Sequence, residues 1–472
     1  MTHRKYFQMC AAIAAAVAIL AITRGQNACA AEKLVVHEWG TFTSLQDENG
    51  KALGGINVDD EPVPDFVYGN KGEWISNLRP QYSIPPRVIS KGAPQRNPYV
   101  TMRLETPVMY FYLPKSLPRP TVLNVNVEFR GGWLTQYYPF ADANAPGHSN
   151  HSVGDKLERD TVTRLTWDGL RVGLAGKVPA TTEAVWLTPR NVKADSVTTA
   201  NGESEKYLFY RGVGNVDAPL SVSTNLSTGD LSIRSAIDKP LAEREPQNIL
   251  WLWLVHNRPD GTVAYRALKP VTATADHSAI AASTSSKFAE ADYSRDNLLR
   301  LQRSMHAALM SEGLFDEEAT AMLQTWQKSY FAAGGQRLFY IVPRPWVEDR
   351  LPLTISQPAE ITRVMMARTE LVSPEQRDLL KRLATAPRSN PKWVQDLDKD
   401  RPAVQTFLSG HSGFGDLGVA IPQDYQLYMD LGRFRNALVL HEAQRNSNPV
   451  LTTFINNYAL RTFYGADERK TP

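Results

Sequence analysis

The sequence predicts an α+β protein, with an N-terminal antiparallel β-sandwich-like domain followed by a mixed, mainly helical C-terminal domain. From Leu34 to about Val271, short apolar runs alternate with Gly- and Pro-containing turns, a pattern typical of sandwiches and open barrels. Beyond residue 290 apolar residues recur at helical spacing. The chain of 472 residues also exceeds what one core usually supports. The predicted units are a signal peptide at 1–30, a β-rich domain at 31–271, a linker at 272–290 and a helix-rich α+β domain at 291–472.

The first thirty residues have the pattern of a secretory signal peptide. Arg4 and Lys5 precede an unbroken apolar run, and Ala28-Cys29-Ala30 is a small-residue cleavage pattern. The apolar run is too short to indicate a membrane span. We therefore expect a periplasmic or secreted protein with no membrane span in its mature chain.

Removal of this segment changes the cysteine content and the charge. Both cysteines, Cys10 and Cys29, lie in it, so the mature chain would have no disulfide, no Cys-ligated metal and no thiol catalysis. Three of the 52 basic residues and none of the 49 acidic residues lie there, which leaves 49 of each. A neutral chain without a Lys/Arg cluster gives no electrostatic reason to expect nucleic acid as a partner.

The stretch from Leu34 to Ser44 opens the predicted mature protein and is its most chemically rich segment. Its alternation predicts a strand that sends His37 and Trp39 to one face and Glu38 and Phe42 to the other. His37 and Glu38 would share a pocket only where the strand ends or bulges. The alternative is a first strand whose Trp39 and Phe42 fill a core while His37 and Glu38 contact polar neighbours.

Further strands and turns follow in the β-rich region. Thr121 to Phe129 alternates polar and apolar residues and predicts a strand with one solvent-facing side. Gly- and Asp-containing turns predict two hairpins, which pair Ser221–Leu226 with Leu231–Ile237 and Asn248–Val255 with Val263–Leu268. Long irregular stretches at 47–98 and 139–155 are expected to form the walls of a site, because structureless loops of this length are usually functional or disordered.

The region beyond the predicted linker is expected to be mainly helical. Asp292–Glu312 and Asp316–Ala332 carry apolar stripes at helical spacing and predict an antiparallel pair. Strand-like runs follow, and one of them is Ile361–Val372. Ser373-Pro374-Glu375-Gln376 is a helix-start signal, with a capping Ser, Pro in the first turn and Gln at the third position.

An acidic run is the first candidate for chemistry. Asp59, Asp60 and Glu61 lie between Gly54-Gly55 and a Pro-x-Pro sequence, which would hold three carboxylates in a constrained loop. Closely spaced carboxylates raise the pKa of at least one of them, as a general acid requires, and they also suit calcium. The alternative is a solvated acidic loop.

Histidine and arginine residues supply further candidates. His148 and His151 are ligand types for a transition metal, although neighbouring Asn and Gly also fit polar surface. The Gly-rich loop around His411 fails the contexts of a nucleophile elbow and a dinucleotide fingerprint, and it would place His411 at a cleft. Arg211 follows a short strand and precedes a glycine, a position suited to gripping a carboxylate or forming a structural salt bridge. No metal or cofactor is identified.

Several segments together resemble a family of secreted bacterial proteins that is known only as uncharacterised. The resemblance is carried by Val36 to Thr43 (Val-His-Glu-Trp-Gly-Thr-Phe-Thr), Asp59 to Pro64, Glu105 to Val108, Phe209 to Gly214 and Leu431 to Phe434. It covers most of the predicted mature chain. It implies no reaction and assigns no catalytic residue.

Three functions remain open on the sequence. The preferred hypothesis is an exported hydrolase or lyase, such as a glycoside hydrolase, that acts on an extracellular polymer or its fragments, or on a small molecule. His37, Glu38, Asp59, Asp60 and Glu61 would supply acid and base, and Trp39, Arg211 and His411 would bind substrate. The ten Trp and eighteen Tyr residues would stack on rings of the substrate. The alternatives are a non-catalytic envelope binding or assembly protein and a metalloprotein centred on His37, His148 and His151.

Overall fold

The computed structural model describes residues 32–58, 63–69, 89–90, 93–94, 96–144, 157–245, 247–408 and 417–460. The predicted signal peptide lies outside these residues. Within them the protein has a mixed α+β fold with large sheets, and its helices are mostly C-terminal, as the sequence predicts. None of the described helices is long and apolar enough to cross a membrane.

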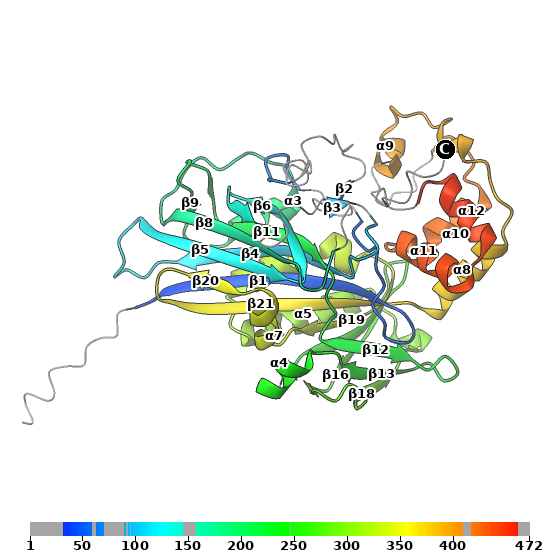
Figure 1. Ribbon diagram of the computed structural model, residues 1–472, viewed down its shortest axis with the longest axis horizontal. Coiled ribbons are helices and arrows are strands. Elements are labelled where there is room, and N and C mark those ends of the chain that lie inside the picture. The colour runs from blue at the N-terminus through cyan, green and yellow to red at the C-terminus, as the bar shows by residue number, and fades with distance from the viewer. Residues whose placement is uncertain are drawn as a thin grey trace, which may run out of the picture.

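The core of the fold is a large sheet through the middle of the molecule (Figure 1). Within the described residues its strands are, in spatial order, β16 (Val263–Leu268), β15 (Leu252–Asn257), β19 (Gly335–Ile341), β21 (Ala359–Leu371), β1 (Leu34–Gln46), β4 (Met102–Tyr112), β11 (Leu208–Gly214) and β6 (Gly132–Tyr138). β1 pairs in parallel with β21 along its whole length and antiparallel with β4. The first and last of the long strands therefore lie side by side at the centre.

Strand pairing crosses the predicted division of the chain. Strands from both sides of the predicted linker, 272–290, belong to one sheet. The linker itself contains β18 (Ile280–Ser285), which pairs with β13 (Asp230–Ser235). β18 is partly exposed, which explains a composition low in branched apolar residues. The predicted linker therefore contributes a strand to the three-stranded sheet β12-β13-β18.

One face of the large sheet packs against a second sheet. Its described strands are β10 (Ser204–Glu205), β9 (Val197–Thr198), β8 (Val162–Val172), β5 (Thr121–Arg130) and β20 (Leu353–Ile355), with β7 (Asp142–Asn144) paired to β8. Phe42 and Met109 of the large sheet share a core with Val125 and Leu165 of the second. β5 buries alternate residues and exposes Val122, which confirms the prediction of a strand with one solvent-facing side.

The opposite face of the large sheet is covered by helices, and we call it the helical face. The predicted antiparallel helix pair is present as α5 (Asp296–Ser311) and α6 (Asp316–Thr325), and α6 continues into a π-helical turn, η4 (Gln327–Phe331). Trp39 of β1 packs here with Met305 and Trp326. The two faces of β1 thus belong to two different cores.

The remaining elements are short. The predicted hairpin at 221–237 is present as β12 (Leu220–Thr224) and β13, and that at 248–268 as β15 and β16. Other described pieces are β2 (Ile89–Ser90), β3 (Ala93–Pro94), α3 (Ala184–Leu187), η2 (Pro189–Asn191), α4 (Lys239–Arg244), β14 (Gln247–Ile249), β17 (Val271–Ala273), η3 (Glu290–Asp292) and α7 (Arg344–Arg350).

C-terminal helices gather at one end of the large sheet, on the right in Figure 1. They are α8 (Pro374–Thr385), η5 (Pro391–Val394), α9 (Pro402–Leu408), α10 (Gln423–Asp430), α11 (Arg435–Asn446) and α12 (Pro449–Asn457). α8 begins with the predicted capping box, in which the Ser373 side chain accepts from the Gln376 N–H. Leu45 of β1 and Val213 of β11 share a core with Leu438 and Phe454 of these helices.

Glu48 joins the turn after β1 to the C-terminal helices. Its carboxylate accepts hydrogen bonds from Arg377 of α8 at 2.5 Å and from Arg445 of α11 at 2.7 Å. Burial by itself raises the pKa of Glu48, but a backbone hydrogen bond and the bonds from Arg445 and Arg377 outweigh it and lower the pKa from 4.5 to about 2. The charged form of Glu48 therefore stabilises this junction.

We predict that Glu48→Gln lowers the melting temperature at neutral pH and that this difference disappears in acid. Because the folded-state pKa lies below the unfolded value, the contribution of Glu48 is complete above pH 4.5 and is lost as the pH falls towards 2. Melting curves of both proteins between pH 7 and pH 2 measure it. The exposed Glu360→Gln serves as control and should change stability little throughout. A constant difference between wild type and Glu48→Gln across this range would refute the assignment.

Candidate functional site

The structure places His37 and Glu38 on opposite faces of the large sheet, as the alternation of β1 predicts. His37 lies on the helical face and is 4% exposed, whereas Glu38 is fully buried on the face covered by the second sheet. The two side chains therefore do not meet in one pocket.

Glu38 is held in a buried ion pair. Its Oε2 accepts from Arg363 Nε at 2.6 Å, and its Oε1 accepts from the Tyr210 hydroxyl. Burial raises the pKa of Tyr210 well above its usual value and the Glu38 charge raises it further, so the hydroxyl keeps its proton. This environment matches the alternative in which Glu38 contacts polar neighbours rather than substrate.

His37 connects β1 to the start of α6. His37 Nδ1 lies 2.8 Å from Glu318 Oε2, which also accepts from the Phe315 backbone N–H. Glu318 Oε1 accepts from the Tyr112 hydroxyl at 2.7 Å. The imidazole packs between the rings of Phe315 and Tyr112. Its visible role is to fix the N-terminus of α6 on the sheet.

A row of irregular pairings crosses the large sheet. The register shifts between Trp39 and Thr41 against β4, between Phe209 and Gly212 against β4, and between Arg211 and Gly212 against β6. Thr106 of β4 has a φ of 46° at the centre of this row. Bulges re-aim side chains and are frequent beside functional sites.

The Gly40 position shows how tightly this row packs. A Cβ atom added there would lie 3.0 Å from Met365 Sδ and 3.0 Å from Pro107 Cα. An added Cβ would press on both neighbours, so glycine suits the point where β1 passes the bulge of β4.

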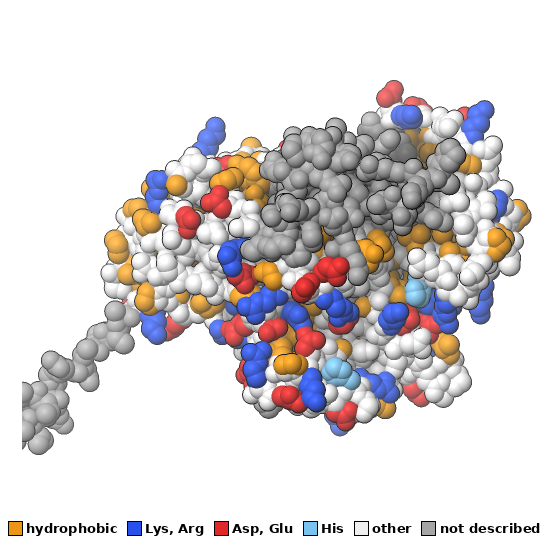
Figure 2. Space-filling model, in the orientation of Figure 1, with side chains coloured by type: hydrophobic (Ala, Val, Ile, Leu, Met, Phe, Trp, Pro, Cys, Tyr) orange, Lys and Arg blue, Asp and Glu red, His pale blue; other side chains and the backbone are white. Residues whose placement is uncertain are grey.

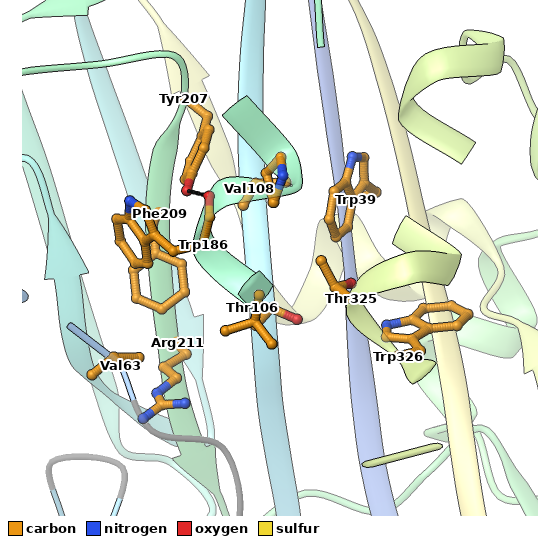
Figure 3. Close-up of a pocket in the computed structure, with 12 residues that line it drawn as sticks. Trp39, Val63, Thr106, Val108, Trp186, Tyr207, Phe209, Arg211, Thr325 and Trp326 are labelled. Atoms are coloured by element: carbon orange, nitrogen blue, oxygen red, sulfur yellow. Dashed lines mark hydrogen bonds between the residues drawn. The ribbon is translucent and has the colours of Figure 1, made fainter. Parts of the chain in front are cut away.

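A cavity opens on the helical face beside these bulges (Figure 3). Its volume is about 480 Å³ when the mouth is included. The walls come from β1, β4, β11, α3 and the end of α6, and they consist of Trp39, Val63, Thr106, Val108, Val185, Trp186, Pro189, Tyr207, Phe209, Arg211, Thr325 and Trp326. Most of these side chains are aromatic or aliphatic, as in typical small-molecule sites.

Two polar donors that line this cavity have no hydrogen-bond partner among the described residues. The indole N–H groups of Trp39 and Trp326 are buried and have no acceptor in the part of the chain that the structure describes. The Thr41 hydroxyl, next on the same face of β1, also has none there. Figure 3 shows the indole nitrogen of Trp326 directed towards the space beside Thr106 and Thr325. Leaving a buried donor unpaired costs about 1–3 kcal/mol.

Beneath the cavity, Glu105 is the centre of a buried polar network. Glu105 Oε1 contacts Arg103 at 2.5 Å and Arg433 at 3.1 Å, and Oε2 accepts from Thr43 at 2.5 Å and Tyr330 at 2.6 Å. The Tyr330 ring also stacks on the Trp326 indole, with centroids 5.2 Å apart. The network therefore supports one wall of the cavity.

More charged residues extend this network along the same face. Arg368 donates to Glu370 at 2.6 Å, and Arg337 Nε lies 3.3 Å from Glu370. Burial lowers the pKa of Arg337 to about 10, which still keeps it charged at neutral pH. On the molecular surface in Figure 2, by contrast, Lys and Arg are interspersed with Asp and Glu over the described part of the visible face. Three fully buried arginines, Arg103, Arg337 and Arg368, thus belong to the polar network below the cavity.

All five segments that carry the family resemblance have residues at this place. Trp39 and Thr43 come from the first, and Val63 comes from the second. Glu105, Arg211 and Arg433 come from the third, fourth and fifth. Glu105 and Arg433 are 328 residues apart in the chain. The two predicted substrate-binding residues Trp39 and Arg211 both line the cavity, where Arg211 Nε donates to the Gln136 side chain.

Other predicted site residues lie outside the described residues. These are Asp59, Asp60, Glu61, His411 and the pair His148 and His151. Their proposed roles stay predictions. Among the described residues, no group of three or more His, Cys, Asp or Glu side chains is arranged to hold a metal ion.

Several cavity residues were not predicted as site residues from the sequence. Trp326 lies on an ordinary apolar helical stripe, Trp186 lies in a segment for which the sequence predicted neither an element nor a site, and Thr106 gives no signal apart from the Pro that follows it. Their convergence depends on pairings between distant strands.

Comparisons with known proteins add little to this picture. No family model and no curated protein matches the chain. Among solved structures, the chain is similar to the Fcho1 Mu homology domain of Danio rerio with bound Eps15 peptide, with a TM-score of 0.28 and 9% sequence identity, over 73% of this chain and 98% of that chain. A likeness at this TM-score supports no statement about fold or function.

We predict that Glu38→Gln destabilises the protein by about 3–5 kcal/mol, because it leaves the buried Arg363 charge without its counter-ion. Urea denaturation measures the change. The exposed pair of Arg258 with Glu290 provides the matched control, since Glu290→Gln should cost no more than about 1 kcal/mol. A Glu38→Gln protein as stable as the control would show that the pair is not structural.

We predict that Tyr330→Phe lowers the free energy of unfolding by about 1.5–3 kcal/mol, the usual contribution of a buried hydrogen bond to a charged group. The substitution removes only the hydroxyl that donates to Glu105. Tyr265→Phe in β16 is the control, because its half-buried hydroxyl meets no carboxylate among the described residues. Equal denaturation midpoints for the two variants would contradict a supporting role for the Glu105 network.

Proposed function

We propose that this protein is an exported binding protein that holds a small ligand in the cavity between β1, β4, β11, α3 and α6. The observation that carries the proposal is a concave aromatic site whose two buried indole donors have no partner among the described residues. Buried donors normally pair with protein, water or ligand, so each of these two indole N–H groups can donate to a molecule that enters the cavity. Export is supported by the signal-peptide pattern of residues 1–30.

Binding accounts for the described cavity better than catalysis does. Its described lining contains no His, Asp, Glu, Lys or Cys side chain that could transfer a proton or attack a substrate. His37 is engaged with Glu318, and Glu38 faces the other core. The hydrolase or lyase hypothesis consequently rests on Asp59, Asp60 and Glu61, and the metalloprotein hypothesis rests mainly on His148 and His151, all outside the described residues.

The scaffold suits such a role. Two sheets that share one core give the strands a fixed position. The irregular pairings then set the directions of Trp39, Thr106 and Arg211. The strands remain paired in register on either side of each irregularity. A site built on strands rather than on long loops is well preorganised for binding.

We predict that Val185→Trp blocks the cavity and weakens ligand binding by about tenfold or more, because the larger side chain takes the ligand's space. Val185 is a half-buried residue of α3 that lines the cavity. The ligand is to be found in two ways, by mass spectrometry of small molecules released from protein purified from its native compartment and by a thermal-shift screen of cyclic compounds. Saturation at one hundred times Kd should stabilise the wild type by about 2.7 kcal/mol.

Leu187→Trp is the matched control for this variant. Leu187 lies two residues further along the same helix, is 39% exposed and does not line the cavity. It should keep wild-type affinity in calorimetric titrations. Absence of any released or screened ligand, or equal affinity of Val185→Trp and wild type for every ligand found, would overturn the proposed function.

A further inference from the structure

We propose that Asn201-Gly202, in the turn between β9 and β10, is a site of spontaneous deamidation in the folded protein. The same dipeptide at Asn49-Gly50, in the turn after β1, is protected by its packing. These are the two Asn-Gly sequences of the chain. Such a covalent modification goes beyond the proposed binding function and is independent of it.

Deamidation of an asparagine needs only the next peptide group and water. The backbone nitrogen of the following residue loses its proton to hydroxide and attacks the side-chain carbonyl carbon, and the side-chain amide leaves as ammonia. Water then opens the resulting five-membered imide at one of its two carbonyls, which leaves either aspartate or isoaspartate. Glycine favours this reaction because it has no Cβ to hinder the attacking nitrogen and because it allows the backbone rotation that ring closure requires.

The turn at Asn201-Gly202 leaves room for ring closure. Both residues are exposed. Gly202 has a φ of 91°, and a Cβ atom added to it would meet no atom within 4 Å other than those of its chain neighbours. Its backbone N–H donates to the Thr199 carbonyl at 3.0 Å. This bond lies in an exposed turn, where local opening costs little free energy. The attacking nitrogen is therefore accessible to hydroxide.

Hydrogen bonds at Asn201 activate its side-chain amide. Asn201 Oδ1 accepts from the Thr199 hydroxyl and, at 3.4 Å, from the Glu203 backbone N–H. As the new bond forms, negative charge collects on this oxygen, and donors already directed at it stabilise that charge. The amide nitrogen of Asn201 has no hydrogen-bond partner among the described residues. Release of ammonia therefore breaks no contact with the described part of the protein.

The turn at Asn49-Gly50 is packed against the β12–β13 hairpin. Asn49 is exposed, but a Cβ atom added to Gly50 would overlap Ser221 Oγ, and the Gly50 carbonyl accepts from the Ser221 hydroxyl at 3.0 Å. Asn49 also forms a β-bridge with Ser223. The N–H groups of Asn49 and Gly50 both donate to Asp47 at 2.9 Å. Rotation of this peptide group into an imide would break several of these contacts, so the fold protects Asn49.

The modified turn belongs to a hairpin that supports one wall of the cavity. Glu205 of β10 pairs with Val197 of β9, and its carboxylate accepts from Trp186 Nε1 at 3.0 Å and from Arg190 at 2.7 Å. Trp186 lies in α3 and lines the cavity. Deamidation of Asn201 adds a negative charge to the turn, and an isoaspartate also lengthens its backbone by one carbon. The change therefore falls beside the Glu205 anchor of α3.

The test is peptide mapping of the folded mature protein after incubation at mildly alkaline pH, which supplies hydroxide for the first step. Trypsin places the two Asn-Gly sequences in separate peptides, 34–51 and 194–206. Mass spectrometry measures the mass increase that accompanies the change from amide to acid, and an isoaspartyl methyltransferase assay identifies isoaspartate. We expect peptide 194–206 to be modified several-fold faster than peptide 34–51.

The same chain denatured in guanidinium is the matched control. Both peptides should then react at similar rates, because the dipeptide alone determines the rate once the packing is lost. The incubation lasts until both have reacted in this control. Folded Asn201→Gln should leave peptide 194–206 unmodified over that time, because glutamine must close a larger ring.

Three results would overturn the proposal. The first is a peptide 194–206 that stays unmodified in the folded protein over the time in which the denatured chain reacts. The second is an equal rate for the two peptides in the folded protein, which would show that packing does not distinguish the two turns. The third is modification of peptide 194–206 in Asn201→Gln at the wild-type rate, which would place the reaction at another residue.

Discussion

The parallel pairing of β1 with β21 is the constraint on which the rest of the structure depends. It joins Leu34–Gln46 to Ala359–Leu371 along their whole length and places both strands at the centre of the sheet, with a core on each side. A strand covered on both faces accepts polar residues only when each meets a partner. In this register Glu38 lies opposite Arg363 and Thr43 opposite Arg368. The ion pair of Glu38 and the polar network near Thr43 are thus direct consequences of one strand pairing.

Short sequence patterns were sufficient to predict individual strands, turns and helix starts. The alternation of β1, the turn residues of the 221–237 hairpin and the capping box at Ser373 depend on neighbours a few residues apart, and each was predicted. The pairing of β1 with β21 joins residues such as Glu38 and Arg363, which are 325 positions apart. No pattern in the sequence of either strand predicts that the other is its partner. The predicted division into N- and C-terminal domains therefore rests on local composition and periodicity alone. Only part of the candidate site could be predicted from the sequence for the same reason, because Trp39 and Arg211 stand out locally whereas Trp326 is one residue of a helical stripe.

The charged residues below the cavity require their own explanation. Buried charges are costly, and even well-paired ones often stabilise a protein no more than apolar residues of similar size. Here Arg103, Glu105 and Tyr330 connect the sheet, the turn after α6 and, through Arg433, the C-terminal helices. Because hydrogen bonds and ion pairs are directional, they fix the relative positions of these three parts of the chain. Apolar contacts, which are not directional, specify such positions less precisely. Because Tyr330 stacks on Trp326, the same network also fixes the position of one unpaired indole donor.

Irregular backbone occurs on both sides of the cavity. On the sheet side, successive strand pairings lose register and Thr106 has a positive φ. On the helix side, α6 ends in the π-helical turn η4 next to Trp326. β-bulges, a positive φ at a non-glycine residue and a π-helical turn each interrupt regular backbone structure. All three are frequent at functional sites. Packing of a sheet on a helix does not require either of them, and they arise from segments that are distant in sequence. Their coincidence around two unpaired donors is therefore most simply explained if the cavity itself is what this part of the fold maintains.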